Sequence, residues 1–267
     1  MVTATLADVS TRRLLGVDFA IVDYERTLDA IDAMVASGER GYICHIPVHA
    51  LMSARRDPET LAALADSALT VPDGMGVVWA LRGLGEPIRD RVYGPELMLR
   101  QCGRAAATRQ RTFLYGGHDQ ATLERLKGEL RRRFPGIEIA GSYSPPHREL
   151  TPEEDGEVAR RIDASGADVV WCGIGSPRQE KWVWRMRERL DAPVLAAVGA
   201  AFDFISGRVS QAPAWMQRRG LEWLYRMIRE PRRLGPRYLR DNPAFAAAFA
   251  RQWLSERRGA PAVGGTA

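Results

Sequence analysis

Residues 111–143 read RTFLYGGHDQATLERLKGELRRRFPGIEIAGSY. A short apolar run, Arg111–Tyr115, ends at the glycine pair Gly116-Gly117, and an amphipathic stretch, Asp119–Phe134, follows it. A second apolar run, Ile137–Tyr143, comes next. Two strand-length runs joined through a helix-length segment predict a βαβ unit, in which the two strands are parallel.

The same alternation extends in both directions from this unit. Thr151-Pro152-Glu153-Glu154 has the form of a capping box and starts a helix to Ser165. The other expected strands are Gly41–Ile46, Leu69–Pro72, Asp168–Gly173 and Pro193–Val198, and the other expected helices are Tyr24–Ser37, Pro47–Arg55, Pro58–Ala68, 75–82, Pro95–Thr108 and Arg178–Leu190. This pattern predicts an α/β fold with a Rossmann-like, mostly parallel sheet and helices on both faces.

The pattern changes after Pro213, where no further strand is expected. Two helices, Ala214–Arg229 and Leu234–Trp253, are predicted there, separated by Pro231. We therefore divide the chain into a Rossmann-like catalytic core, residues 1–207, a basic amphipathic helical appendage, residues 208–258, and a disordered tail, residues 259–267.

Charge is unevenly distributed along the 267 residues. The net charge is +5, yet residues 208–267 alone contain 12 Arg and four acidic residues. Such a basic segment suits phosphates, an anionic membrane or nucleic acid.

The isolated Cys44, Cys102 and Cys172 are expected to be reduced, buried thiols. With no apolar stretch long enough to span a bilayer and no signal peptide, a soluble or peripheral cytoplasmic protein is expected.

In a parallel sheet the ligand binds beyond the carboxyl ends of the strands, so residues at these positions are the candidates for chemistry. Asp73 follows an expected strand and could act as a general base. Its local sequence alone favours the alternative that it caps the next helix.

Glycine-rich turns follow other strands and could admit a diphosphate against the backbone. They are Gly116-Gly117, Gly173–Gly175 and Gly199–Ala201, and none forms a complete dinucleotide fingerprint or a Walker A motif.

Gln179 could hydrogen-bond a sugar or base, whereas Glu180 could simply complement the helix dipole. The four histidines have no metal-ligand spacing, so no metal is expected.

The stretch from Trp215 to Arg229 mixes bulky apolar residues with Arg. It could lie at a membrane interface, with Trp at headgroup depth and Arg on phosphates. Its arginines could also reach a diphosphate. The alternative is an ordinary helix that packs Trp and Leu on the core and leaves Arg in water.

Taken in order, these segments resemble the WecG/TagA/CpsF glycosyltransferases, glycosyltransferase family 26. The resemblance runs from about residue 14 to residue 240. Its stretches are Val71–Val78, Arg91–Gly94, Phe113–Gly117, Arg133–Ile137, Gly173–Trp182, Gly199–Asp203, Gln211–Trp215, Leu221–Arg226 and Glu230–Arg233.

The resemblance implies an inverting, metal-independent transfer from a UDP-sugar to a polyprenyl-diphosphate-linked sugar, in cell-envelope polysaccharide, teichoic-acid-type or exopolysaccharide biosynthesis. Asp73 matches the proposed catalytic base, and Gln179 belongs to a Pro-x-Gln-Glu motif. Other expected substrate-binding residues are His49, Gly74, Gly116, Gly117, Gly175, Glu180, Asp203, Arg226, Arg233 and Arg237. The expected partners are these two substrates and an anionic membrane surface at the inner face of the plasma membrane. Nucleic acid and cofactors are not expected, and a homo-oligomer is compatible with the sequence.

Three positions depart from the family pattern. Cys44 and Ile46 stand where many members have Thr and Asn, and Gln211 stands where many have Arg. These changes remove hydrogen-bonding groups and put the usual N-acetylmannosamine chemistry in question. Two alternatives remain at this point: another Rossmann-type enzyme with a nucleotide cofactor, and a non-catalytic basic module that binds lipid or nucleic acid.

Overall fold

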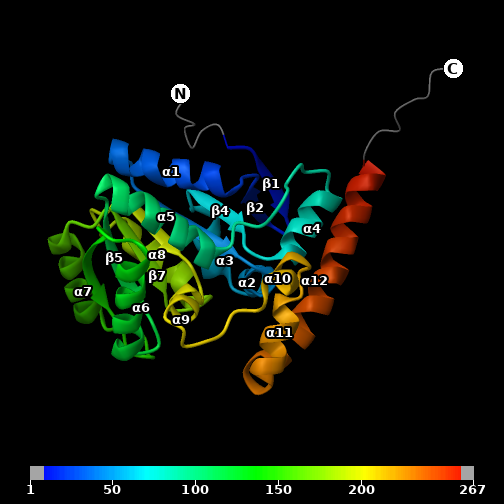
Figure 1. Ribbon diagram of the computed structural model, residues 1–267. Helices are drawn as coiled ribbons and strands as arrows, with labels where there is room; N and C mark the ends of the chain where they lie inside the picture. Colours follow the sequence, from blue (N-terminus) through cyan, green and yellow to red (C-terminus); the bar gives the residue numbers. More distant parts are fainter. Residues whose placement is uncertain (1–8, 260–267) are drawn as a thin grey trace.

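The computed structural model describes residues 9–259 (Figure 1). Its centre is a six-stranded sheet in the order β4-β3-β8-β7-β5-β6, and every neighbouring pair is parallel. The strands are β3 (Gly41–Ile46), β4 (Leu69–Pro72), β5 (Arg111–Gly116), β6 (Glu138–Tyr143), β7 (Val169–Gly173) and β8 (Val194–Ala197). The predicted α/β class with a parallel sheet is confirmed. The strand order is not the 3-2-1-4-5-6 order of dinucleotide-binding domains.

Helices cover both faces of this sheet (Figure 1). One core lies beneath α1 (Tyr24–Ser37), α5 (Gly94–Thr108), α6 (Gln120–Arg133) and the short α9 (Ala201–Ile205). The other lies beneath α2 (Val48–Ala54), α3 (Pro58–Ala65), α4 (Met75–Gly83), α7 (Pro152–Ser165) and α8 (Arg178–Arg187). Because both faces are covered, strands such as β3 are buried along their whole length.

The expected boundaries agree with the structure to within a few residues, and the local chemistry explains them. The Thr151–Glu154 capping box forms at the start of α7, and Gly38 ends α1 in the left-handed conformation. All three cysteines are buried and free, as expected.

An N-terminal hairpin and α9 are additions that the sequence pattern did not reveal. The strands β1 (Thr11–Leu14) and β2 (Val17–Ala20) pair antiparallel as a separate two-stranded sheet. Leu14 and Phe19 of this hairpin are fully buried in the core beneath α2 and α4. Four-residue strands carry too few residues for periodicity to distinguish them.

The C-terminal region is helical, but the predicted division of this region into two helices was wrong. The expected helix Ala214–Arg229 is two helices, α10 (Ala214–Arg218) and α11 (Glu222–Arg229). Gly220 separates them with a φ of 69°, and a Cβ at this position would meet the Trp79 ring at 2.5 Å. The next helix, α12 (Pro231–Gly259), starts at Pro231 rather than after it. A proline fits the first turn of a helix because no amide donor is needed there.

Of the predicted tail, Gly259 is the last residue of α12, and residues 260–267 lie outside the described part of the chain. Helix α12 lies along one side of the molecule, with α10 and α11 beside it (Figure 1).

Two neighbouring strands approach each other closely where β5 and β7 end. Gly116 has a φ of 137°, and a Cβ on it would lie 2.6 Å from the backbone of Gly173. Glycine is therefore required here for two reasons, backbone conformation and space.

We predict that Gly116→Ala lowers the free energy of unfolding by about 3 kcal/mol or more, because strain and overpacking add at this site. Gly85→Ala is the matched control, since Gly85 has a φ of 93° but a Cβ added to it would meet nothing within 4 Å. It should cost about 1 kcal/mol from strain alone. Urea unfolding of both variants measures the difference, and equal losses would contradict the close-approach argument.

Candidate active site

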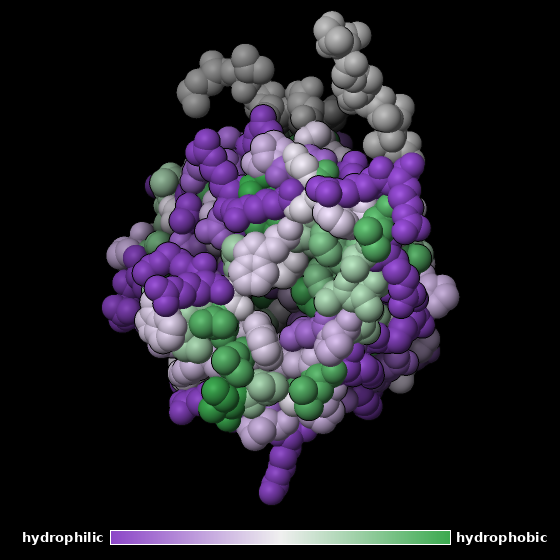
Figure 2. All heavy atoms as spheres, turned by 90° about the vertical axis from the view of Figure 1, so that its right-hand side faces the viewer, coloured by the Kyte–Doolittle hydropathy of each residue, from purple (hydrophilic) through white to green (hydrophobic). Residues whose placement is uncertain are grey.

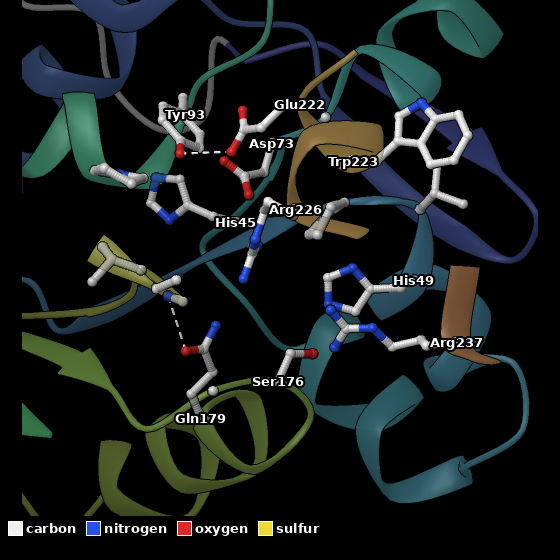
Figure 3. A pocket seen from close by; sticks show the side chains of 18 of the residues that line it. His45, His49, Asp73, Tyr93, Ser176, Gln179, Glu222, Trp223, Arg226 and Arg237 are labelled. Atoms are coloured by element: carbon white, nitrogen blue, oxygen red, sulfur yellow. Dashed lines mark hydrogen bonds between the residues drawn. The ribbon is translucent and has the colours of Figure 1, made fainter. Parts of the chain in front are cut away.

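A cavity of about 940 Å³ lies along the carboxyl edge of the sheet, where residues that follow all six strands line it. The opposite wall is formed by α11 and α12. Figure 2 shows this side of the molecule, with a hollow surrounded by apolar and polar side chains. The cavity thus lies between the core and the C-terminal helices and opens on this side, and Figure 3 shows its interior.

Asp73 lies at the end of β4 and points into this cavity (Figure 3). Its Oδ1 accepts a hydrogen bond from the backbone amide of Gly94 at 2.9 Å, the first residue of α5. The N-cap of α4 is Gly74, which makes no side-chain capping bond. Asp73 therefore does not cap the helix that follows it, as the alternative interpretation required; it binds the start of a different helix.

Burial raises the pKa of Asp73 from its usual value to about 6, against the opposing effects of Arg91 and the Gly94 amide. A carboxylate with this pKa is still ionised at neutral pH, and it is a stronger base than an exposed aspartate.

An ion-pair network lies beside Asp73. Arg91 Nη1 lies 2.7 Å from Glu222 Oε2 of α11, and the Tyr93 hydroxyl donates to Glu222 Oε1 at 2.8 Å. Gln211 Nε2 donates to the same Tyr93 hydroxyl at 3.2 Å. This network fastens the C-terminal helices to the wall that carries Asp73.

Arginines from the C-terminal helices form the facing wall. Arg226 points toward the centre of the cavity, and Arg237 lies next to His49 (Figure 3). The Nε atoms of Arg226 and Arg237 are buried and have no hydrogen-bond partner within the described chain. Burial lowers the pKa of Arg237, and the neighbouring charges of Arg226 and Arg233 lower it further. Within the described chain, Arg226 and Arg237 thus bring positive charge here without an ion-pair partner of their own, since Glu230 pairs with Arg233. This arrangement suits a bound anion.

Gln179 is held in a fixed orientation at the start of α8. Its Oε1 accepts from the Gly199 amide at 3.0 Å, and its Nε2 donates to Glu180 Oε1 at 3.0 Å. Glu180 is fully buried behind this wall, and its Oε2 has no partner among the described residues. Burial raises the pKa of Glu180 to about 7. Glu180 lies in the first turn of α8, where an acid complements the helix dipole, and it is fully buried there.

Two histidines line the cavity in the neutral form. His45 Nδ1 lies 3.1 Å from the carbonyl oxygen of Ala197, so this nitrogen carries the proton and Nε2 is left as an unpartnered acceptor among the described residues. Burial lowers the pKa of His45 to about 4. Burial and the charges of Arg237 and Arg226 hold the pKa of His49 well below its usual range. Within residues 9–259, no three His, Cys, Asp or Glu side chains are grouped to hold a metal ion.

The structure brings most of the predicted site residues to one cavity. Its lining includes Asp73, His49, Gly74, Gly117, Gly175, Gln179, Asp203, Arg226, Arg233 and Arg237. Gly116 and Glu180 are not part of the lining and lie behind it. Asp203 forms an ion pair with Arg208 at 3.3 Å, and Arg233 pairs with Glu230 at 2.5 Å.

Residues that sequence reasoning did not single out also shape the site. Arg91 and Tyr93 lie within a family-like stretch, but nothing in their local pattern assigned them a role. Glu222 is one of few acids in a basic segment, which could have marked it as a paired residue. Cys44 and Ile46, two of the departures from the family pattern, are fully buried and do not line the cavity.

A parallel α/β sheet with a carboxylate of raised pKa at its carboxyl edge, facing a group of unmatched arginines, has the organisation of an enzyme active site. Comparison with known proteins gives the class. A model of the glycosyl transferase WecG/TagA/CpsF family matches residues 12–259. The chain therefore belongs to this family of glycosyltransferases.

Two relatives from Bacillus are each called N-acetylglucosaminyldiphosphoundecaprenol N-acetyl-beta-D-mannosaminyltransferase. The protein of Bacillus spizizenii strain W23 is 34% identical over 180 residues, which cover 67% of this chain and 68% of that protein. The protein of Bacillus subtilis strain 168 is 32% identical over 179 residues, with the same coverage.

The buried Glu180 gives a prediction about stability. Its folded-state pKa of about 7 lies above the ordinary 4.5, so the folded protein holds this proton more tightly than the unfolded chain. The stabilisation is complete below pH 4.5 and is lost as the pH rises through 7. Glu180→Gln should therefore be more stable than the unmodified protein at pH 8.5, by at most about 3 kcal/mol, and much less so at pH 5.

Urea unfolding at both pH values measures this difference. The control is Glu157→Gln, a change at an exposed position of α7, which should give no pH-dependent difference. If the Glu180→Gln difference were the same at pH 5 and pH 8.5, Glu180 would not titrate in this range.

Proposed function

We propose that this enzyme transfers a sugar from a UDP-sugar to a polyprenyl-diphosphate-linked sugar, with inversion and without a metal ion. The observation that carries the proposal is the placement of Asp73 and the unmatched arginines Arg226 and Arg237 on facing walls of one cavity. The names of the two Bacillus relatives support an undecaprenyl-diphosphate-linked N-acetylglucosamine as acceptor and a β-linked product.

Asp73 acts as the general base in this proposal. Its Oδ1 is held by the Gly94 amide, and the other carboxylate oxygen receives the proton of an acceptor hydroxyl. That hydroxyl oxygen forms a bond to the anomeric carbon as the bond from this carbon to the UDP oxygen breaks. Attack from the face opposite the diphosphate inverts the anomeric carbon. The products are the extended lipid-linked saccharide, UDP and protonated Asp73.

The leaving diphosphate needs neutralising charge, which the C-terminal helices supply. Arg226 and Arg237 have buried Nε atoms without a partner in the described chain, and Arg233 lines the same wall. The glycine turns at Gly117 and Gly175 let phosphate oxygens approach the backbone from the sheet side. Charge stabilisation of a leaving group in a desolvated site is a large catalytic contribution, which makes a metal ion unnecessary.

The outer surface of the C-terminal helices is suited to an anionic membrane at the inner face of the plasma membrane. Large apolar side chains of these helices are exposed, namely Trp215, Trp223, Ile228 and Leu239, of which Trp223 also lines the cavity. Arginines lie between them in the sequence. Figure 2 shows apolar side chains gathered around the hollow on this side. Interfacial binding uses this combination of Trp, aliphatic residues and Arg. No helix within residues 9–259 has the length and hydrophobicity to cross a bilayer.

The unmatched arginines predict anion-linked stability. Inorganic pyrophosphate, used as a probe, should raise the Tm of the protein in the presence of EDTA, because it supplies the missing negative charge. Arg237→Gln should reduce this rise by at least half. Arg232→Gln is the control, since Arg232 is exposed and does not line the cavity. A rise that is unchanged in Arg237→Gln would contradict the assignment of this wall to the diphosphate.

The base assignment predicts a loss of turnover. Asp73→Asn should lower kcat by about 10²–10⁴-fold, because the amide cannot accept the proton. The assay is acceptor-dependent UDP release in EDTA, with a panel of UDP-sugars that includes UDP-N-acetylmannosamine and with a soluble diphosphate-linked sugar as acceptor. NMR of the product reads the anomeric configuration.

Asp18→Asn, at an exposed position of the hairpin, is the matched control and should retain full activity. Near-normal UDP release by folded Asp73→Asn protein would exclude Asp73 as the base. Activity that EDTA abolishes and Mg²⁺ restores would exclude the metal-independent mechanism.

A further inference from the structure

We propose that Glu222 is a positioning residue that, through Arg91, sets the strength of Asp73 as a base, so that base strength depends on α10 and α11 being seated on the core. This inference rests on the proposed function, in which Asp73 is the base. It assigns a role to Glu222, an acidic residue of α11 that contacts neither the acceptor hydroxyl nor the anomeric carbon in the proposed reaction.

One short segment of the core serves both Asp73 and Glu222. The Gly94 amide binds Asp73 Oδ1 at 2.9 Å. Within the same four residues, the Tyr93 hydroxyl and the Arg91 guanidinium bind the two carboxylate oxygens of Glu222, at 2.8 and 2.7 Å. In Figure 3 the carboxylates of Asp73 and Glu222 lie next to each other. The segment 91–94 is therefore a direct physical connection between the base and α11.

The polar contacts of the Arg91 guanidinium lead to the C-terminal helices. Its Nη1 pairs with Glu222 of α11, and its Nη2 donates to Gln217 Oε1 of α10 at 3.1 Å. The guanidinium carbon lies 3.9 Å from the centre of the Tyr93 ring, which fixes its plane. If α10 and α11 left the core, Arg91 would lose both acceptors while remaining beside Asp73. The nearest carboxylate available to it would then be the base itself.

Several charges act on Asp73 from the surrounding elements. Arg91 of the core and Arg226 of α11 lower its pKa, and Glu222 raises it, in addition to the larger effect of burial. Tyr24 of α1, Tyr93 and Glu180 of α8 are the other titratable groups whose pKa depends on Asp73. Loss of the Glu222 charge therefore lowers the pKa of Asp73, and loss of the Arg91 charge raises it. A lower pKa makes a weaker base.

The test compares the Asp73 pKa in three full-length variants, Glu222→Gln, Arg91→Gln and the double variant. Carboxyl ¹³C NMR titration of Asp-labelled protein measures it, with Asp73→Asn used to assign the resonance. We expect Glu222→Gln to increase the acid dissociation constant of Asp73 about tenfold and Arg91→Gln to decrease it about tenfold. The double variant should lie closer to Arg91→Gln than to the unmodified protein, since Glu222 acts mainly through Arg91.

The pH dependence of kcat/KM gives the functional readout. Activity requires ionised Asp73, so kcat/KM should fall at low pH, and this fall is the acidic limb of the profile. The midpoint of the limb should move to lower pH in Glu222→Gln and to higher pH in Arg91→Gln, by the same amounts as the NMR values. Maximal kcat should fall about tenfold in Glu222→Gln. Glu222→Asp, which restores the charge, should return the limb toward its original position.

Glu256→Gln is the matched control. Glu256 lies on α12 and pairs with Arg12 of the hairpin, so this variant makes the same chemical change at a different contact between the C-terminal helices and the core. It should leave both the Asp73 pKa and the acidic limb unmoved.

Two outcomes would overturn the inference. An unchanged Asp73 dissociation constant in folded Glu222→Gln protein would show that Glu222 does not set the strength of Asp73 as a base. A uniform loss of activity, with both the Asp73 dissociation constant and the acidic limb unmoved, would show that Glu222 only holds the helices in place. A third outcome concerns the proposed function instead: if the NMR value shifts as expected but the acidic limb does not follow it, Asp73 is not the base.

Discussion

The ion pair between Arg91 and Glu222 is the contact on which the site depends. Both side chains are almost fully buried, at 10% and 11% exposure, so each charge needs the other. Removing one partner of such a pair typically costs about 3–5 kcal/mol, although the intact pair is worth little compared with a well-packed apolar contact. Its value here is geometric. A buried charge pair accepts one arrangement of α11 on the core, whereas an apolar contact would tolerate several.

The walls of the cavity have complementary electrostatic roles. The core side carries Asp73, whose charge is partly offset by Arg91, together with neutral His45. The helical side carries Arg226 and Arg237, whose buried donors have no partner in the described chain. In the proposed reaction, the hydroxyl of the acceptor lies at the wall with Asp73, and the diphosphate of the donor lies at the wall with the arginines.

The sequence was sufficient for the layered fold because alternation of apolar runs and amphipathic helices is a local property. It also placed Asp73 at a strand end. It could not show that Asp73 binds Gly94, because this contact joins the end of β4 to α5 and depends on how the strands are ordered. Local capping rules favoured the wrong helix for the same reason.

Sequence reasoning failed for the C-terminal region in a different way. Periodicity runs through Ala214–Arg229, but Gly220 adopts a positive φ and packs closely on Trp79, so one helix became two. Glu180 was expected among the substrate-binding residues, yet it lies behind the lining, and its acceptor orients the amide of Gln179. For Gly220 the deciding partner, Trp79, is distant in the sequence, whereas Glu180 contacts its neighbour Gln179 and its burial was not visible from the local pattern.

The two halves of helix α12 are held to the core by different contacts. Its C-terminal half is tied to the core at several points: Gln252 bonds to Leu15 and Arg13 of the hairpin, and Trp253 to Gly83. Its N-terminal half contains Pro236 and Pro243, each of which removes one backbone hydrogen bond. This N-terminal half is also fastened to the core, because its buried Asp241 pairs with Arg56 at 3.1 Å. The two prolines thus loosen the backbone of the half of α12 that carries Arg237, while the ion pair keeps that half on the core.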